Sequence, residues 1–372
     1  MTKQLHALTV DVRGAAGRAP LRFVVRLLLV ALALFGLSRL VRPGDLQRGL
    51  GMVRDVGWPL LLVLLPTAAA MMLDAAGWRQ ILAALGFGVR WLRMVELRLS
   101  VEAIVLAMPG GSVAGEAAKV ALLDRRADVP LPAGAASLAL TKLLLTAGDA
   151  AYLLFAALVM VAAGVGSESL TLRLALAGAA FTGVAAFVLR HLLRRSQPAT
   201  RLVRALDRLP SARLRGWIRA RGERFGALDV ATRRYFAQPA ATRARCFAPF
   251  LLEWFTEGLE TFLILRCLGQ SLGLGPTLAF DGVGSLLRAV VVVVPAGLGV
   301  QDAAQIILLR QLGVADPIGT GAAFVFTKRT KELFWIIVGL AFLGIRRDLW
   351  RRPGGWPARI QADALAAKGR GA

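Results

Sequence analysis

Histidine and cysteine are scarce in this chain, with two of each among 372 residues. His6 lies near the N-terminus and His191 at the end of an apolar run, so the spacing of a metal site or a nucleophile–base pair is absent. Cys246 and Cys267 would stand about 30 Å apart on one helix and cannot pair with each other. CxxC, Gly-x-Ser-x-Gly, P-loop and dinucleotide fingerprints are also missing. We therefore expect no metal, no cofactor and no enzymatic activity.

Acidic residues are few as well: 23 Asp and Glu stand against 46 Lys and Arg, which gives a net charge of +23. Such a charge attracts phosphates, as in nucleic-acid-binding proteins. However, 56% of the residues are hydrophobic, which a soluble basic domain does not show. Lys and Arg also collect on the cytoplasmic flanks of membrane proteins. We prefer that explanation and expect no nucleic-acid partner.

The apolar residues occur in blocks of about 18 residues or more with few charges, and roughly 20 helical residues cross the hydrocarbon layer. The blocks are residues 23–41, 58–75, 133–165, 170–192, 246–272, 278–298 and 318–345. The sequence therefore predicts an all-α, polytopic integral membrane helical bundle over 23–345. The first block is not followed by a small-residue cleavage pattern, so we expect it to be a retained span and not a signal peptide.

The positive charge is concentrated in the polar stretch 193–245, which has 14 arginines against three acids. By the positive-inside rule this loop, the N-terminal segment 1–22 and the tail 346–372 are expected on the cytoplasmic side of the cell (inner) membrane. Six apolar residues of the loop approximate one helix face; they are Leu214, Trp217, Ile218, Phe225, Leu228 and Tyr235. Either this helix lies on the anionic inner leaflet, or the loop is a solvated connector.

An internal repeat is visible at an offset of 186 residues. Residues 109–123 are PGGSVAGEAAKVALL and residues 295–309 are PAGLGVQDAAQIILL. Glu116 is matched by Asp302, and the same offset pairs Lys142 with Lys328, each preceded by a threonine. The shared proline, glycine, acid and Thr-Lys pair indicate two copies of one unit.

Each copy, 91–165 and 277–345, has an apolar arm, a Pro-Gly break, a short helix expected to start at the acid, and a long span. Lipid cannot satisfy the backbone groups freed at such a break, so protein or a water-filled cavity must cover it. We expect each copy to be a re-entrant helical hairpin followed by a transmembrane helix. Counting crossings between the copies places them in opposite orientation. Inverted repeats with broken helices are typical of secondary transporters; the alternative is a duplication kept for packing.

Several ionisable groups fall inside the apolar blocks, where each costs about 2.5–3.5 kcal/mol or more without a partner or cavity. Glu253, Glu257 and Glu260 share one helix face at i, i+4 and i+7. The candidate substrate-binding or pathway residues are Gly111, Glu116, Lys142, Glu253, Glu257, Glu260, Arg288, Gly297, Gln301, Asp302, Lys328, Arg329 and Glu332. Alternatively, such charges only fix helix register or snorkel to the interface.

The glycine-rich breaks suggest what the hairpins bind. A helix that starts at a break points unpaired N–H groups at it and attracts anions such as phosphate. Glu116 and Asp302 could instead cap those helices themselves. The two can also alternate: the acid caps the helix when the site is empty, and a lipid phosphate beside Lys142 or Lys328 replaces the acid when lipid binds. Membrane lipids with an anionic headgroup are therefore the expected partners.

At these residues the chain resembles the lysylphosphatidylglycerol synthase transmembrane, or flippase-like, family. The segments SLLRAVVVVVPAGLGVQDAAQIILL and FTKRTKELFWIIVGL are similar to the hopanoid biosynthesis-associated branch, whose core is Pro-x-Gly-Leu-Gly-Val-Gln-Glu. Asp302 stands where that branch has Glu, which weakens the implied hopanoid substrate. The resemblance implies movement of polar or polyprenyl-type lipids between leaflets. Synthases of the family carry a soluble catalytic domain after the membrane part, and the 27 residues 346–372 are too short for one.

Three functions remain open at this point. Lipid translocation comes first, because the breaks and buried charges are typical of a transporter. A non-transporting membrane partner of a lipid-biosynthesis enzyme comes second. An intramembrane lipid transferase that uses only carboxylates comes third.

Overall fold

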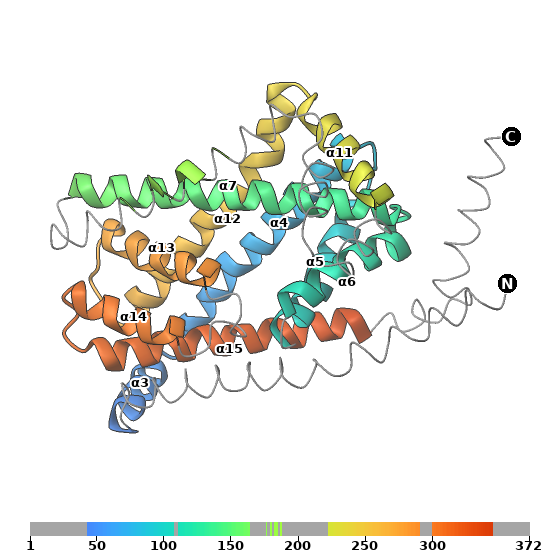
Figure 1. Ribbon diagram of the computed structural model, residues 1–372. Coiled ribbons are helices and arrows are strands. Elements are labelled where there is room, and N and C mark those ends of the chain that lie inside the picture. Colours follow the sequence, from blue (N-terminus) through green and yellow to red (C-terminus); the bar gives the residue numbers. More distant parts are fainter. Residues whose placement is uncertain are drawn as a thin grey trace, which may run out of the picture.

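Figure 1 shows the computed structural model, which describes residues 43–107, 111–163, 222–290 and 300–344, with a few residues between 176 and 187. All regular elements in these ranges are helices, which confirms the all-α prediction. The predicted spans 23–41 and, for the most part, 170–192 lie outside the described residues, as does the predicted tail 346–372.

Eleven helical elements are described. They are α3 (Pro43–Val56), the 3-10 helix η1 (Trp58–Val63), α4 (Leu64–Ala84), α5 (Trp91–Ala107), α6 (Gly111–Ala127), α7 (Leu131–Ala163), α11 (Gly222–Phe236), α12 (Ala240–Cys267), α13 (Leu274–Val290), α14 (Val300–Gln311) and α15 (Pro317–Gly344). Gly57 separates α3 from η1 with a φ of 63°, a conformation that glycine adopts at little cost. We call 43–163 the first half and 222–344 the second half.

Two stretches of the described residues are long and apolar enough to cross a membrane: Trp58–Ala84 and Leu131–Val159. The first is longer than the predicted block 58–75, because residues 76–84 continue the helix with Arg79 as their only charge. Asp74 therefore lies inside the helix and not at its end. Helices α12 and α15 have 28 residues each, but both carry several charged side chains.

Large apolar side chains are exposed along α7 and α15. They are Leu154, Phe155, Leu158 and Val161 on α7, and Leu333, Phe334, Ile337 and Leu340 on α15. Contiguous apolar surface of this kind marks a protein or membrane contact. On helices of 33 and 28 residues, it is the surface expected to face acyl chains.

The two halves repeat the same order of helices in nearly the same register. Helix α7 begins at residue 131 and α15 at residue 317, and 317 − 131 = 186. The contacts repeat as well: α3 and α5 pack against α15, while α11 and α13 pack against α7. The helices that match in order and contacts therefore include α3 and α4, which precede residue 91, where the predicted first copy begins.

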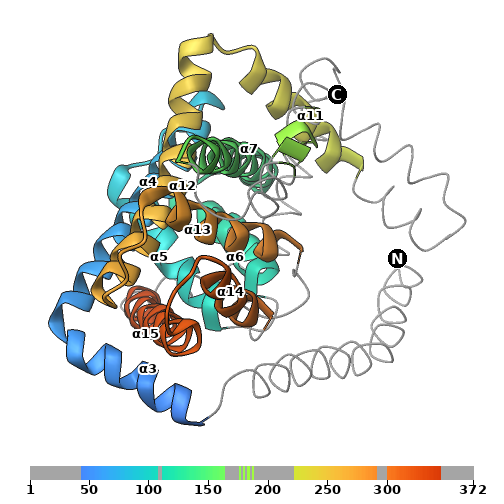
Figure 2. The same cartoon turned by 90° about the vertical axis from the view of Figure 1, so that its left-hand side faces the viewer.

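The paths of the two long helices are opposite. In Figure 1, α7 starts on the side of α6 and α15 starts on the side of α14, at the other end of the molecule. Figure 2 looks along both helices and shows them on opposite sides of α13. Helices α4 and α12 make the most extensive contact between the halves.

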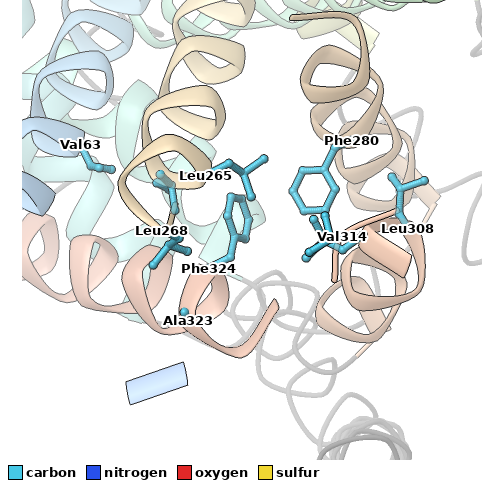
Figure 3. Close-up of a cluster of buried hydrophobic side chains, with 10 residues drawn as sticks. Val63, Leu265, Leu268, Phe280, Leu308, Val314, Ala323 and Phe324 are labelled. Carbon is cyan, nitrogen blue, oxygen red and sulfur yellow. The ribbon is translucent and has the colours of Figure 1, made fainter. Parts of the chain in front are cut away.

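The hydrophobic core repeats at the same offset. One buried cluster in the first half contains Trp78, Leu82, Met94, Leu122 and Leu123. Adding 186 gives Ile264, Leu268, Phe280, Leu308 and Leu309, which belong to one buried cluster in the second half. Figure 3 shows most of this second cluster, where the rings of Phe280 and Phe324 meet edge to face at 5.0 Å between centroids. Equivalent positions thus hold each half together.

Helix α11 packs against α7, which corrects one expectation. Tyr235 was expected either on a face that lies on the inner leaflet or in a solvated connector, and it is instead buried in a protein cluster with Leu140, Leu144 and Phe250. Burial raises the pKa of the Tyr235 phenol. Its hydroxyl donates a hydrogen bond to the carbonyl of Arg243 at 3.5 Å.

One detail of the predicted hairpins is wrong. Helix α6 begins at Gly111, so Glu116 lies more than one turn inside it and cannot act as its N-cap. In α14 the acid Asp302 falls in the first turn. Gly115 lies where α6 approaches α5: a Cβ there would overlap Cγ2 of Val105.

Candidate functional site

A network of charged side chains links helices of the first half to one another and to α12 of the second half. We call it the Asp74 network; its members are Asp74 on α4, Arg98 and Glu102 on α5, Glu116 and Lys119 on α6, Lys142 on α7 and Glu253 on α12. Arg98 forms ion pairs with both Asp74 and Glu102. Lys119 lies 3.7 Å from Asp74, with its ammonium group 5.6 Å from the centroid of the Trp78 ring. The network therefore ties α4, α5 and α6 together at the level of Asp74.

The edge of this network reaches the molecular surface at Lys142. Its Nζ lies 2.5 Å from Oε1 of Glu116, and the side chain is 50% exposed. The same Glu116 oxygen is 3.9 Å from Lys119. The sequence analysis named Glu116 and Lys142 separately, and the structure brings them together as an ion pair. A charge pair with one exposed member is suited to exchange its partner for a ligand group.

Glu253 enters the network from α12. Glu253 is 9% exposed. The charged groups that act on it are Asp74, Arg98, Lys119 and Glu257. The buried oxygen Oε2 of Glu253 accepts no hydrogen bond within the described part of the chain, and neither does Oδ1 of Asp74. Such atoms lose the hydrogen bonds that water would supply. The centre of the network thus contains carboxylate oxygens with free acceptor capacity.

A second network lies about two helical turns further along the α4–α12 contact. We call it the Glu260 network; it consists of Thr67, Glu260, Lys328 and Lys331. Lys331 Nζ lies 2.5 Å from Oε1 of Glu260, and the hydroxyl of Thr67 donates to Oε2 at 2.6 Å. Glu260 is 3% exposed, so this carboxylate is desolvated but fully partnered.

The remaining charges of α15 lie closer to the surface. Arg329 pairs with Glu332 at 2.8 Å within the helix, and both side chains are a little more than a quarter exposed. Lys328 places its ammonium group 5.2 Å from the centroid of the Phe324 ring. The cationic side of α15 thus faces both Glu260 and the surface.

Two further buried carboxylates, Asp149 and Asp281, are held by hydroxyl groups. Ser285 donates to Asp149 at 2.6 Å across the α7–α13 contact. Asp281 accepts from Tyr152 at 3.0 Å and from Thr261 at 2.8 Å. These bonds join α7, α12 and α13, so polar groups extend along the interior of the bundle.

Some predicted site residues cannot be placed in these networks. Gly297 lies outside the described residues, and only the backbone of Arg288, Gln301 and Asp302 is described, in α13 and α14. Gly111 is the first residue of α6. Their roles stay predictions.

The predicted site residues did not include Asp74, Arg98, Glu102 or Lys119. A signal for Asp74 existed, because 74 + 186 = 260 makes it the counterpart of Glu260. Arg98 and Glu102 are four residues apart on a helix, the spacing of an ion pair. None of the described residues form a group of three or more His, Cys, Asp or Glu that could hold a metal ion.

Comparison with known families gives one match. The sequence model of the family described as Lysylphosphatidylglycerol synthase TM region matches residues 23–339, which is most of the chain and contains both networks. No curated protein matches the chain.

Proposed function

We propose, from the premise that the chain belongs to the Lysylphosphatidylglycerol synthase TM region family, that this membrane protein moves a polar lipid between the two leaflets of the bilayer. The observation that carries the proposal is the pair of ionic networks on the α4–α12 contact, inside a bundle whose helices α7 and α15 expose apolar side chains. A lipid headgroup cannot cross hydrocarbon alone, because ionised groups lose their hydration there. Polar side chains in the bundle interior can replace that hydration.

The arrangement of the halves supports a transport mechanism. The helices of the two halves match at an offset of 186 residues and run in opposite directions, which is consistent with two inverted repeats. Transporters built from inverted repeats bind substrate at the interface between the repeats. We propose that 91–127 and 277–311 are re-entrant hairpins within those repeats. The Asp74 and Glu260 networks lie where α4 of the first half meets α12 of the second half, which supports this proposal.

Glu116 and Lys142 are the proposed entry point for the headgroup. Lys142 is half exposed and bound to a single carboxylate, so a lipid phosphate can compete for its ammonium group. Glu116 would then be free to bind Lys119, which already lies 3.9 Å away. An anionic phosphate is thus exchanged for a carboxylate without leaving a cation unpaired.

The proposal includes the setting of the protein. We propose a cell (inner) membrane location with the basic segment 193–245 and both termini on the cytoplasmic side, by the positive-inside rule. We also propose that it needs no cofactor and carries out no chemical conversion. A hopanoid or polyprenyl-linked lipid remains a candidate substrate beside ordinary phospholipids.

One observation favours a second function. The matching family is described by the transmembrane region of a lipid-modifying synthase. A chain of this family could therefore serve as a non-transporting membrane partner of a lipid-biosynthesis enzyme. In that case the ionic networks would hold the helices in register without binding lipid.

Leaflet-to-leaflet movement of headgroup-labelled lipids in reconstituted vesicles tests the proposal. Several lipid classes should be compared with protein-free vesicles, and at least one should move faster when the protein is present. Glu116→Gln should slow that movement while the protein stays folded. Rates equal to those of empty vesicles for every class would refute transport. Copurification with an enzyme that loses activity on deletion would support the partner function, and product formed by the purified protein alone would support a transferase.

A further inference from the structure

The contact between α4 and α12 contains one hydrogen bond whose repeat counterpart differs in chemistry. When two equivalent elements pack symmetrically, each contact between residues i and j occurs again with the roles exchanged. Thr67 of α4 donates to Glu260 of α12 at 2.6 Å. The counterparts at the offset of 186 are 67 + 186 = 253 and 260 − 186 = 74. The counterpart of this bond is therefore the pairing of Glu253 of α12 with Asp74 of α4, two buried acids that act on each other electrostatically.

Only one of these two pairs contains a hydrogen-bond donor. A threonine hydroxyl donates a hydrogen bond to the Glu260 carboxylate, whereas two ionised carboxylates have no donor between them. Each of Asp74 and Glu253 keeps a buried oxygen, Oδ1 and Oε2, that accepts no bond from the described residues. The two residues are only 4% and 9% exposed. A proton on one carboxyl would supply the donor that Thr67 supplies in the other contact.

The charge balance of the Asp74 network points the same way. It has four acids, Asp74, Glu102, Glu116 and Glu253, against three bases, Arg98, Lys119 and Lys142. The three bases make their ion pairs with the first three acids. Glu253 is therefore the acid in excess, and one proton makes the network neutral.

The other charged groups around Asp74 and Glu253 do not neutralise the excess negative charge. The charged groups that act on Asp74 or Glu253 are Arg98 of α5, Lys119 of α6, Lys142 of α7 and Glu257 of α12. Those that act on other residues of α12 are Asp281 of α13, and Lys328 and Lys331 of α15. The two lysines of α15 act on Glu260. Glu257 is an acid and adds to the negative charge near Glu253, while Asp281 accepts hydrogen bonds from Tyr152 and Thr261.

We propose that Asp74 and Glu253 bind one proton between them, and that release of this proton is coupled to lipid movement. The second clause rests on the proposed function. Binding forms an O–H bond on one carboxylate oxygen, and release transfers that proton to a water molecule; no other bond changes. Without the proton, two buried carboxylates repel each other at the contact of the two halves. Proton release thus favours a state in which α4 and α12 separate at this level.

Infrared difference spectroscopy of the purified, lipid-reconstituted protein tests proton binding without any transport. At neutral pH the wild type should show the carbonyl stretch of a protonated carboxyl, which Glu253→Gln and Glu253→Thr should both lose. Glu253→Thr copies the donor of the other half and so should preserve the packing. Asp128→Asn removes an exposed carboxyl at a positive φ that Asn tolerates, and it should keep the band. A wild type without the band, or a band that survives both Glu253 substitutions, would overturn the proton site.

Lipid movement under an imposed pH gradient, with the membrane potential clamped, tests the coupling. The wild-type rate should change several-fold with the gradient, and the Glu253→Thr rate should not respond to it. Wild-type movement that ignores the gradient would overturn the coupling and leave the proposed function standing. No movement of any lipid would overturn the proposed function and the coupling together, while the carboxyl band still decides the proton site.

Discussion

Removing the ammonium group of Lys331 should destabilise the protein strongly, because it leaves Glu260 without its ion-pair partner. Glu260 is 3% exposed and lies 2.5 Å from Lys331. Breaking a buried pair by removing one member costs about 3–5 kcal/mol. Thr67 still donates to Glu260 in a Lys331→Met variant, and Lys328 remains nearby. We therefore expect a loss at the lower end of this range, about 3 kcal/mol.

The assay is reversible unfolding in mixed micelles, followed by the helical circular dichroism signal. Arg329→Met is the matched control on the same helix, since its partner Glu332 is within α15 and both side chains are over a quarter exposed. An exposed pair of this kind contributes about 0–1 kcal/mol. Replacing both members, in Glu260→Gln with Lys331→Met, should restore much of the stability and give a coupling energy of about 0.5–3 kcal/mol. A Lys331→Met loss no larger than that of Arg329→Met would refute the reasoning.

Three further predictions concern the hairpins and the core. Gly115→Ala should destabilise the protein by about 1–3 kcal/mol because its Cβ overlaps Val105, and Val105→Ala should restore part of the loss in the same unfolding assay. The repeat predicts that Asp302 pairs with Lys328, so Asp302→Asn and Lys328→Gln should be non-additive by about 0.5–3 kcal/mol in a double-mutant cycle. Trp78→Ala should cost about 3–5 kcal/mol, measured by unfolding, because Trp78 is fully buried.

Each of these predictions has its contradicting outcome. Gly51→Ala is the control for Gly115, since nothing lies within 4 Å of the added Cβ in α3; equal effects of the two substitutions would exclude steric overlap. Strict additivity of the Asp302 and Lys328 substitutions would mean that the repeat does not extend to this pair. A loss below about 1 kcal/mol for Trp78→Ala would contradict its place in the first-half core.

The sequence predicted the all-helical class of the fold, because this follows from patterns along one chain. Long apolar blocks predict membrane helices, and the spacing of Glu253, Glu257 and Glu260 predicts one charged helix face. The structure agrees that the first and last of these are buried between helices. The match of Glu116 with Asp302 gave the offset of 186 at which α7 and α15 begin.

The parts that the sequence analysis missed depend on contacts between distant residues. Asp74 was placed near the end of a span, and only the observed length of α4 puts it inside. Arg98 and Lys119 pair with it from two other helices, which no local pattern reveals. Tyr235 followed the helical period correctly, but its burial beside α7 was not predicted, because the period alone cannot distinguish a neighbouring helix from the membrane surface or from solvent.

The most direct test of the account is the rate of labelled-lipid movement when the charges of Glu116 and Lys142 are exchanged. These two side chains form a 2.5 Å ion pair at the half-exposed edge of the Asp74 network. Glu116→Lys and Lys142→Glu should each stop movement, and the double variant should recover it in part, since the pair is re-formed. A folded Glu116→Lys protein that moves lipid at the wild-type rate would contradict passage of the headgroup along this network.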